Sequence, residues 1–562
     1  MASAAARAWT PDRCSPATSV LNSSAKSNRL PVLGTSGWVD MLFPRFSGVL
    51  GRSEPAGMRS GTHLSGREST SSMPTVPGRA ASGPARILVI DVGSTSVRTA
   101  VVDASGHLRH TRRLPTPRRS PAPGLLEFDP VALADAAITA ATATLTEAGA
   151  VDAVGIANQR ASTVVWDRAS GAPVGPGLGW QDLRTALDCL SLQGEGLRLA
   201  PNQPATKAAH LIGAAGAPPE RLCVGTLDSW LVWNLTGGTQ HLTDATNAAI
   251  TGLCHTDRVE WDHAVAERLG IPAAGLPRIV DSSGPLIEAA ALPGSPLVAG
   301  VAGAQQAALV GAGCVRRGDV KITFGTGATL DACLGPGDPP AEIRGPSGTF
   351  PIVAWQQHGQ VTWGIEAMML SAGSCVAWLC ELGLLEDPGR SDAVAAGSLD
   401  SAGVRFVPAQ MGLGTPDWDF GARSAFTGLT TTAGTAHLVR AVLEGVAHRG
   451  VDLLEAARAD SGLELAEVVV DGGMSVNGTF LQALADASGQ RVRVAPEMEC
   501  TALGAGYLAG LGIGAWDGWD EVASLRAPTR TVEPHRQADR AAWQEAKRRA
   551  AGWHPDLSAV SF

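Results

Sequence analysis

The sequence lacks several patterns that mark common classes of protein. No apolar run in its 562 residues reaches the roughly 18 residues that a helix needs to cross a bilayer, so an integral membrane protein is not expected. The formal net charge is −9 and no basic stripe is present, which argues against a nucleic-acid partner. The nine cysteines are scattered, without CxxC pairs or metal-ligand spacing, and predict reduced, mostly buried thiols in a cytoplasmic protein.

Two common phosphate-binding motifs are also missing. No GxxxxGK[ST] segment occurs, and no GxGxxG segment opens a helix. A hydrophobic content of 44% and a charged content of 17% are those of an ordinary globular protein. The length leaves room for two or three domains with sizeable cores, and it leaves a homo-oligomer open.

Residues 1–84 differ in composition from the rest of the chain. They are rich in Ser, Arg, Gly and Pro, nearly free of acidic residues, and without a sustained helical or strand period, which predicts disorder. No continuous apolar stretch follows the first basic residues, which argues against a secretory signal. A transit peptide, a disordered tail and a reading frame opened too early remain open. We favour the last, because Met73 stands shortly before the first predicted strand.

The most informative segment runs from Ile87 to Asp103. Ile87–Asp91 is typical of a buried strand, residues 93–96 of a tight polar turn, and Arg98–Asp103 of a second strand. The turn offers backbone N–H groups, three hydroxyls and a glycine without a Cβ, which together suit a polyphosphate. Asp91 would lie beside those phosphates, where a bound Mg²⁺ would offset its charge. An ordinary hairpin explains the segment equally well.

A second hairpin of the same kind follows about 230 residues later. Lys321–Phe324 and Leu330–Leu334 are predicted strands, and residues 325–329 form the turn between them. Repetition of one unit at this distance predicts two related domains that face each other across a cleft, each with a phosphate loop. With no helix after the first turn, the pattern favours the actin-like (ribonuclease H-like) ATPase fold.

The remaining segments alternate between strand and helix, which predicts an α/β protein with mixed sheets. We expect domains at 85–310 and 311–525 and a charged helical tail at 526–562. The predicted strands are Val151–Ala157, Thr163–Trp166, Pro296–Ala302 and Val468–Val470, and the predicted helices are Ala132–Ala148, Thr226–Leu235, Trp363–Leu382 and His437–Ala459. A Gly-rich turn at 471–473 precedes another helix that begins near Asn477, and this turn suits either an adenine pocket or a plain strand-to-helix connection.

Together these segments resemble the FGGY carbohydrate kinase family, and within it the glycerol kinases most closely. The resemblance covers about residues 87–520. The matching segments are DVGSTSVR at 91–98, GIANQR at 155–160, GVAGAQQAAL at 300–309, TFGTG at 323–327, GLGTPDWD at 412–419, DGGMSVN at 471–477 and TALGAGYLAGL at 501–511. The resemblance implies two actin-like domains that close on ATP, Mg²⁺ and a polyol or sugar and transfer the γ-phosphoryl group to a hydroxyl.

The resemblance also implies roles for individual residues. Asp91 would hold the metal, and Arg160 and Gln305 would bind the small-molecule polyol or sugar. The residues implied to bind the nucleotide and its phosphates are Ser94, Thr95, Ser96, Arg98, Thr326, Gly373, Gly473 and Asn477.

The chain departs from the family pattern on the substrate side. Ala161 stands where glycerol kinases carry a substrate-binding glutamate, and Asn202 stands where they carry a tyrosine. Ala304 occupies the position of the family's catalytic aspartate, and a methyl group accepts no proton. Asp228 and Glu366 lie near recognisable motifs, but the sequence places neither of them at the transferred phosphate.

Three functions compete on these observations. The first is an FGGY-type kinase that phosphorylates an alcohol other than glycerol. The second is a nucleotide-binding pseudokinase with a regulatory or binding role. The third, an ATPase chaperone of the same superfamily, is disfavoured because the NQR and GLGTPDWD segments are present and no separate peptide-binding domain follows.

Overall fold

The computed structural model describes residues 85–560, with the exception of residues 342, 466, 497–498 and 526–529. The expectation for residues 1–84 therefore lies outside the described residues. Among the helices that the structure describes, none is long and apolar enough to cross a membrane.

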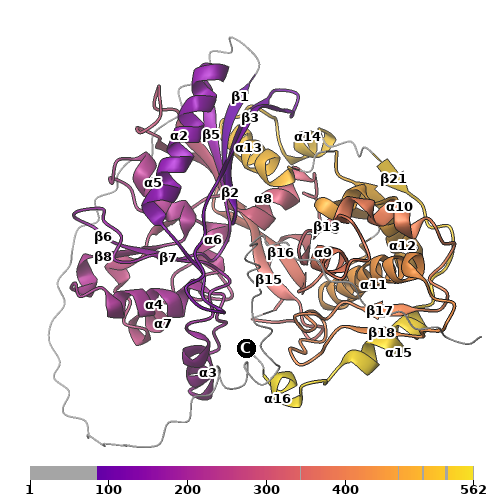
Figure 1. The fold of residues 1–562 in the computed structure, drawn as a ribbon. Helices are drawn as coiled ribbons and strands as arrows, with labels where there is room; N and C mark the ends of the chain where they lie inside the picture. The colour runs from indigo at the N-terminus through magenta and orange to yellow at the C-terminus, as the bar shows by residue number, and fades with distance from the viewer. Residues whose placement is uncertain (1–84, 342, 466, 497–498, 526–529, 561–562) are drawn as a thin grey trace, which may run out of the picture. The chain divides into compact units, whose positions relative to one another are not determined.

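The fold is built on a mixed sheet of 13 strands in the order β21-β20-β19-β13-β14-β16-β15-β11-β12-β5-β1-β2-β3 (Figure 1). These strands are β1 (Arg86–Val92), β2 (Ser96–Asp103), β3 (Leu108–Pro115), β5 (Ala153–Asn158), β11 (Ser283–Glu288), β12 (Leu297–Gly303), β13 (Val320–Phe324), β14 (Ala328–Pro336), β15 (Phe350–Gln357), β16 (Gln360–Met369), β19 (Glu467–Asp471), β20 (Arg491–Val494) and β21 (Arg530–Val532). The shorter strands lie in two-stranded pairs, and they are β4 (Glu127–Phe128), β6 (Val164–Asp167), β7 (Gly177–Leu178), β8 (Leu222–Gly225), β9 (Leu242–Asp244), β10 (Arg278–Val280), β17 (Arg405–Val407) and β18 (Ala425–Thr427).

Helices cover this sheet, and most of the long ones follow a strand directly in sequence. They are α2 (Pro130–Ala148), α3 (Ala186–Gly194), α4 (Pro204–Ala214), α5 (Leu227–Leu235), α6 (Ala245–Ala249), α7 (His263–Arg268), α8 (Ala304–Gly311), α9 (Gly373–Glu381), α10 (Ser391–Ala395), α11 (Thr435–Ser461), α12 (Gly478–Ser488), α13 (Cys500–Gly512), α14 (Trp519–Ser524), α15 (Arg540–Ala550) and α16 (Pro555–Ser558).

The sheet contains the same strand order twice. In the first half of the chain the order is β3-β2-β1-β5-β12, with β1 and β2 antiparallel and β1 and β5 parallel. In the second half it is β16-β14-β13-β19-β20, with β13 and β14 antiparallel and β13 and β19 parallel. The predicted repeat of the hairpin is therefore confirmed, and it extends to the strands beside it.

The first strand shows why the sequence forms a buried sheet. In β1, Leu88 and Ile90 point to a core shared with α2 and α5, while Ile87 and Val89 point to a core shared with α8 and α13. Because successive side chains in a strand face opposite sides, a strand covered on both faces must be apolar throughout. The apolar run before the polar turn follows from this arrangement.

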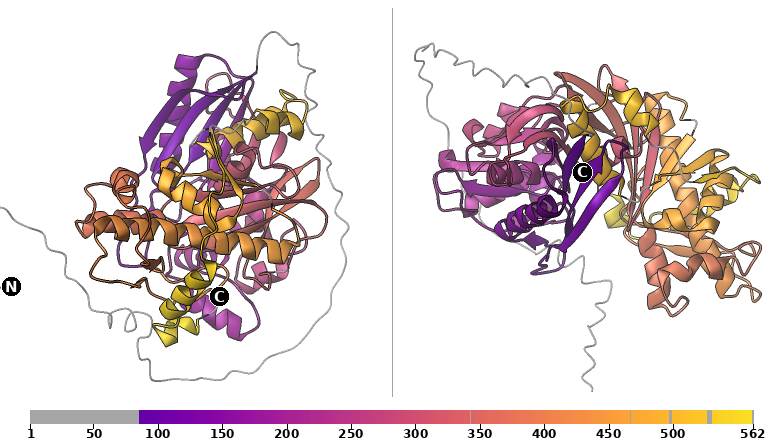
Figure 2. Two further views of the ribbon diagram at one scale, coloured as in Figure 1. Left: turned by 90° about the vertical axis from the view of Figure 1, so that its right-hand side faces the viewer. Right: turned by 90° about the horizontal axis from the view of Figure 1, so that it is seen from above.

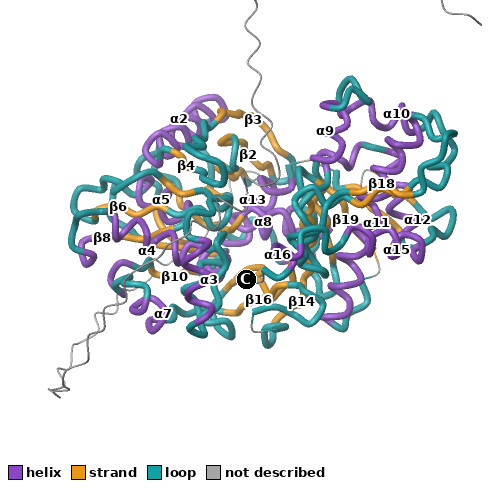
Figure 3. Tube along the Cα trace, turned by 60° about the horizontal axis from the view of Figure 1, so that its bottom comes forward, coloured by secondary structure: helices purple, strands orange, loops and turns teal. Residues whose placement is uncertain are grey.

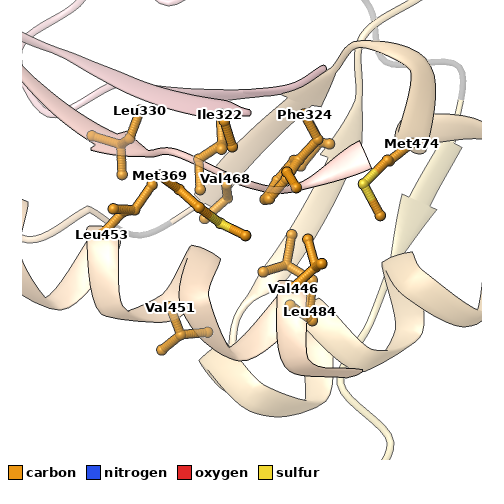
Figure 4. Packing of buried hydrophobic residues seen from close by; sticks show 14 of the residues in the cluster. Ile322, Phe324, Leu330, Met369, Val446, Val451, Leu453, Val468, Met474 and Leu484 are labelled. Atoms are coloured by element: carbon orange, nitrogen blue, oxygen red, sulfur yellow. The ribbon is translucent and has the colours of Figure 1, made fainter. Parts of the chain in front are cut away.

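The second half has a larger core between its strands and its two long helices. Ile322 and Phe324 of β13 and Leu330 of β14 pack against Val446 of α11 and Leu484 of α12 (Figure 4). Helix α11, which covers the predicted helix His437–Ala459, is capped at its C-terminus by Gly462 with a left-handed φ of 66°.

Helix α13 comes late in the sequence but packs on the first half of the sheet. It contacts α8, β12, β5 and β1, and Figure 2 (right) shows this yellow helix alongside the indigo strands. A Cβ on Gly504 would overlap the carbonyl oxygen of Ala307, so this close helix–helix contact requires a glycine. The C-terminal segment thereby closes the core of the N-terminal one.

Most of the predicted elements are present within a few residues, but the predicted helix Trp363–Leu382 is wrong. The segment is the strand β16 followed by the helix α9, as Figure 3 shows. A short apolar run fits a buried strand as well as a buried helix, and here pairing with β14 and β15 decides. The charged tail is also not purely helical, because it contains the strand β21, which pairs with β20. Its helix α15 packs on the core through Trp543, which is fully buried.

Candidate functional site

The turn between β1 and β2 places an acidic and a basic side chain next to each other. Asp91 lies directly opposite Arg98 in the strand pair, and Arg98 Nη1 donates to Asp91 Oδ2 at 3.1 Å. Arg98 also forms an ion pair with Glu499, which precedes α13. Burial raises the pKa of Asp91 to about 6, against the opposing effect of Arg98 and with the support of Glu499. A further cation near this carboxylate would favour its ionised form.

Asp91 is suited to hold a Mg²⁺ ion that arrives with phosphates. Proteins bind Mg²⁺ through one or two carboxylates, retained waters and substrate phosphates. Across the described part of the chain, no group of three or more His, Cys, Asp or Glu side chains could hold a metal ion. One buried carboxylate beside a phosphate loop therefore fits a metal that is shared with a nucleotide.

The three hydroxyls of the first loop differ in how far the protein itself uses them. Ser96 is buried and its Oγ accepts from Arg113 Nε at 2.9 Å. Ser94 is half-buried and its Oγ accepts from Trp180 Nε1 at 3.4 Å, whereas Thr95 is exposed. Ser94 and Thr95 are thus the hydroxyls that a ligand can reach, while Ser96 stabilises the hairpin.

The structure brings together Thr326 and Gly373, two residues that the sequence analysis named as separate nucleotide contacts. Thr326 is exposed, and its carbonyl oxygen accepts from the backbone N–H groups of Ala372 and Ser374 at 2.9 and 3.1 Å. The N–H of Gly373 donates to the carbonyl oxygen of Gly325, and a Cβ on Gly373 would lie 2.6 Å from that oxygen. The second loop is therefore docked on the N-terminus of α9.

The third Gly-rich element lies at the start of α12. Gly472 has a φ of 87° and a Cβ there would lie 2.5 Å from the carbonyl oxygen of Phe324, whereas Gly473 faces open space. Asn477 is 7% exposed; its Oδ1 caps α12 and its Nδ2 donates to Ser391 Oγ at 3.0 Å. The polar atoms of Asn477 are already used in the fold, and its contact with a nucleotide stays a prediction.

Arg160 and Gln305, predicted to bind the polyol or sugar that would accept the phosphoryl group, each contact a residue in the second half of the sheet. Arg160 follows β5, and its Nη2 lies 2.6 Å from Glu366 Oε2 on β16. Gln305, in the first turn of α8, accepts at Oε1 from Lys321 Nζ at 3.3 Å. Ala304 is the first residue of α8 and directly precedes Gln305. Both predicted residues are therefore engaged by charged groups of the second half.

A buried lysine lies beside Asn202, the position at which glycerol kinases carry a tyrosine. Lys207 of α4 is fully buried, and its Nζ donates to the carbonyl oxygens of Gly179, Trp180 and Asn202 at 2.8, 3.1 and 3.4 Å. Burial lowers the pKa of Lys207 to about 7. Through Trp180, which donates to Ser94, this cluster connects the region around Asn202 with the first phosphate loop.

Asp228 serves the fold, and its carboxylate is already occupied. Its oxygens accept from the hydroxyls of Thr226 and Thr243 and from the backbone N–H of Asp244. Burial raises the pKa of Asp228 to about 6, and the charge of Asp244 adds to this effect. Of the two carboxylates considered from the sequence, only Glu366 lies beside a predicted acceptor-binding residue.

Lys321, Asp331 and Lys207 were missed in the sequence, and Glu366 was considered there without being placed at the site. Lys321, Asp331 and Glu366 each stand alone as a charged side chain in an otherwise apolar strand, and Lys207 stands in a mostly apolar helix. Charged residues are rarely fully buried unless they are paired, so an isolated charge in a buried strand is a usable signal for a buried ionic cluster.

Comparison with known proteins agrees with this geometry. Residues 86–311 match the N-terminal domain, and residues 320–513 the C-terminal domain, of the FGGY family of carbohydrate kinases. A glycerol kinase of Aromatoleum aromaticum is 40% identical over 499 residues, covering 83% of this chain and 99% of that protein. A glycerol kinase of Thermus brockianus is 39% identical over 492 residues, with 83% and 99% covered.

A solved structure shows the same architecture. The crystal structure of Plasmodium falciparum glycerol kinase with ADP superimposes with a TM-score of 0.75 at 26% identity, covering 85% of this chain and 99% of that one. The predicted two-domain actin-like fold is confirmed by this similarity. The chain belongs to the FGGY family of carbohydrate kinases.

Proposed function

We propose that this protein is an ATP-dependent kinase that transfers the γ-phosphoryl group of ATP to a hydroxyl of a small polyol or sugar other than glycerol. The duplicated hairpin supports this most strongly. Its first loop offers Asp91, Ser94 and Thr95, and its second offers Thr326 on the N-terminus of α9. Tight turns with exposed hydroxyls, such as those of Thr95 and Thr326, suit bound phosphates.

The residues of this chain would divide the work of phosphoryl transfer. Ser94 and Thr95 would orient the phosphates from one side and Thr326 from the other, while Gly373, Gly473 and Asn477 line the nucleotide. A Mg²⁺ ion held by Asp91 would neutralise charge on the phosphates. Because this reaction depends mainly on positioning and charge neutralisation, these groups supply most of what catalysis needs.

The acceptor is expected to differ from glycerol because this chain has fewer polar side chains that could bind the three hydroxyls of glycerol. Ala161 is 2% exposed and has a φ of 60°, and its methyl side chain offers no hydrogen bond to a substrate hydroxyl. Asn202 offers an amide in place of a phenol, and Ala304 offers no proton acceptor. A site that lacks the partners of a substrate hydroxyl binds that substrate weakly.

A nucleotide-binding pseudokinase is the second candidate, and Ala304 is the observation that favours it. A positioned general base is worth roughly 10² to 10⁴ in rate, so its loss alone would leave slow transfer. In this alternative the two hairpins bind ATP and Mg²⁺, and no acceptor is phosphorylated.

One experiment separates these functions. The full chain is mixed with MgATP and glycerol, a ketopentose such as xylulose, or an aldonate such as gluconate, and ADP release is followed. ADP release above the no-acceptor background with xylulose or gluconate supports the proposal, whereas release that is fastest with glycerol supports a kinase but contradicts the proposed acceptor. ATP binding without acceptor-dependent release contradicts the kinase. Ala304→Asp tests whether a carboxylate at this position raises the rate, and Ala304→Asn controls for the added volume.

A further inference from the structure

A buried row of charged side chains crosses three adjacent strands next to Ala304. Lys321 on β13 lies opposite Asp331 on β14, and Asp331 lies opposite Glu366 on β16. Lys321 Nζ is 2.9 Å from Asp331 Oδ2, and both side chains are 0% exposed. Arg160 completes the row from the other half, 2.6 Å from Glu366. We call these four residues the buried charge row.

The charge row borders Ala304 on both sides along the backbone. A Cβ on Gly303 would lie 2.7 Å from Arg160 Cγ, so the arginine stem packs against the residue before Ala304. The residue after it, Gln305, accepts from Lys321 Nζ at 3.3 Å. Helix α8, which begins at Ala304, packs against β14 and β15. The two cations of the row therefore contact the residues on either side of Ala304, and each of them is paired with one of the two carboxylates.

In this region Arg160 Nη1 and Gln306 Oε1 are buried without a hydrogen-bond partner among the described residues. Buried polar atoms in proteins are almost always satisfied, so this donor and this acceptor are both open to a bound polar group. Donor and acceptor atoms together suit a hydroxyl, which both donates and accepts.

The surroundings of Glu366 suit a proton acceptor. Burial raises its pKa to about 7, the positive charge of Arg160 opposes this, and the charge and hydrogen bond of Asp331 add to it. Lys321 faces Asp331 from β13, and Asp471 on β19 and Cys500 at the start of α13 act in turn on Lys321. A general base works best when its pKa lies near the working pH.

We propose that Glu366 is the general base of this kinase, in place of the missing aspartate at position 304, and that Asp331 and Arg160 are positioning residues for it. Glu366 accepts the proton of the acceptor hydroxyl as the hydroxyl oxygen forms a bond to the γ-phosphorus and the bond to the β–γ bridging oxygen breaks. ADP leaves with that electron pair, and Glu366 returns its proton to water. This proposal rests on the proposed kinase function.

The first test removes only the basic oxygen. Glu366→Gln should lower kcat by about 10²-fold or more, with the KM for ATP within about threefold, because the amide keeps the shape but accepts no proton. In the natural protein kcat should rise with pH through about 7, and the variant should lose this rise. Asp460→Asn is the matched control, since Asp460 also accepts hydrogen bonds in the second half, from Ser347 and Thr349.

A second variant moves the pKa of the base without removing it. Asp331→Asn takes a negative charge from beside Glu366, so the pKa of Glu366 falls and the pH at which kcat rises should shift downward. A role limited to folding would not move this midpoint. The double variant Glu366→Gln/Ala304→Asp should regain at least tenfold in kcat over Glu366→Gln, because it returns a carboxylate to the region.

The outcomes separate this proposal from the proposed function. All assays use the full chain, MgATP and whichever of glycerol, xylulose or gluconate gives the fastest ADP release. If no acceptor gives release, both proposals fail. If the natural protein turns over and Glu366→Gln keeps its rate and its pH dependence, only the general base is wrong. An unchanged midpoint in Asp331→Asn would contradict the assigned pairing even if Glu366→Gln unfolds.

Discussion

The predicted nucleotide side and the predicted acceptor side of this protein are built in opposite ways. On the nucleotide side, Thr95 and Thr326 stand exposed at the tips of two related hairpins, and the backbone beneath them is held by hydrogen bonds. On the acceptor side, Arg160 and Gln305 are tied to Glu366 and Lys321 in a buried ionic row. The predicted nucleotide side presents exposed side chains on a hydrogen-bonded backbone. On the predicted acceptor side, the polar groups bind one another.

This difference indicates which side can change without loss of the fold. The two loops are short turns between paired strands, so their side chains contribute little to any core. The charge row is part of the core of the second half, and each of its members affects its neighbours. Changes to the predicted acceptor side are therefore expected to affect stability and activity together, while changes to the exposed loop residues Thr95 and Thr326 affect activity alone.

The largest expected effect tests whether the charge row stabilises the fold. Lys321→Met leaves Asp331 as a buried carboxylate without its partner, and breaking such a pair typically costs about 3–5 kcal/mol. Denaturant unfolding should show this loss, and the double variant Lys321→Met/Asp331→Leu should recover most of it.

An exposed ion pair in the second half provides the control for this measurement. Arg316 lies 2.9 Å from Asp520, with side chains 62% and 88% exposed, and Arg316→Met should cost less than about 1 kcal/mol. An equal loss in Lys321→Met and Arg316→Met would contradict the view that the acceptor side is part of the core.

The next effect concerns activity on the nucleotide side. Asp91→Asn removes the predicted metal ligand and should lower kcat by roughly 10²- to 10³-fold, as expected for loss of one electrostatic group at a phosphoryl-transfer site. ADP release with the preferred acceptor measures it. Asp103→Asn, at the other end of the same hairpin, should keep the natural rate, because Asp103 accepts from Arg109 and the backbone far from the turn.

The same variant should be more stable than the natural protein above neutral pH. The pKa of Asp91 is raised from 3.8 to about 6, so the folded protein binds more protons than the unfolded chain between these values. Its contribution to stability therefore falls as pH rises through this window and is lost above about 6. Thermal melts at pH 8 without nucleotide should show a higher Tm for Asp91→Asn, and a lower Tm would contradict the burial of a strained carboxylate.

The sequence predicted the two hairpins better than the buried charge row for physical reasons. A turn between two strands is a local feature, and Gly93 to Ser96 carries its own signature within a few residues. The charge row depends on register across three strands, and the pairs Lys321–Asp331 and Asp331–Glu366 join residues that no local period connects. The error at Trp363–Leu382 has the same origin, since only pairing with β14 and β15 marks β16 as a strand.

The smallest expected effect separates the two roles of Asn477. Its Oδ1 caps α12 by accepting from Phe480 N at 2.8 Å, and the resemblance to the family also implies a contact with the nucleotide. Asn477→Ala should cost about 1 kcal/mol of stability through loss of the cap. Asn477→Asp keeps a capping oxygen and, at an N-terminus, a favourable charge, so it should retain stability. If ATP affinity falls in both variants while only Asn477→Ala loses stability, the side chain contacts nucleotide as well as capping the helix. The opposite outcome is that Asn477→Asp binds ATP as the natural protein does, and that Asn477→Ala loses ATP affinity only as far as its loss of stability accounts for. Asn477 then only caps the helix, and the free groups of the predicted nucleotide side are confined to the two hairpin loops.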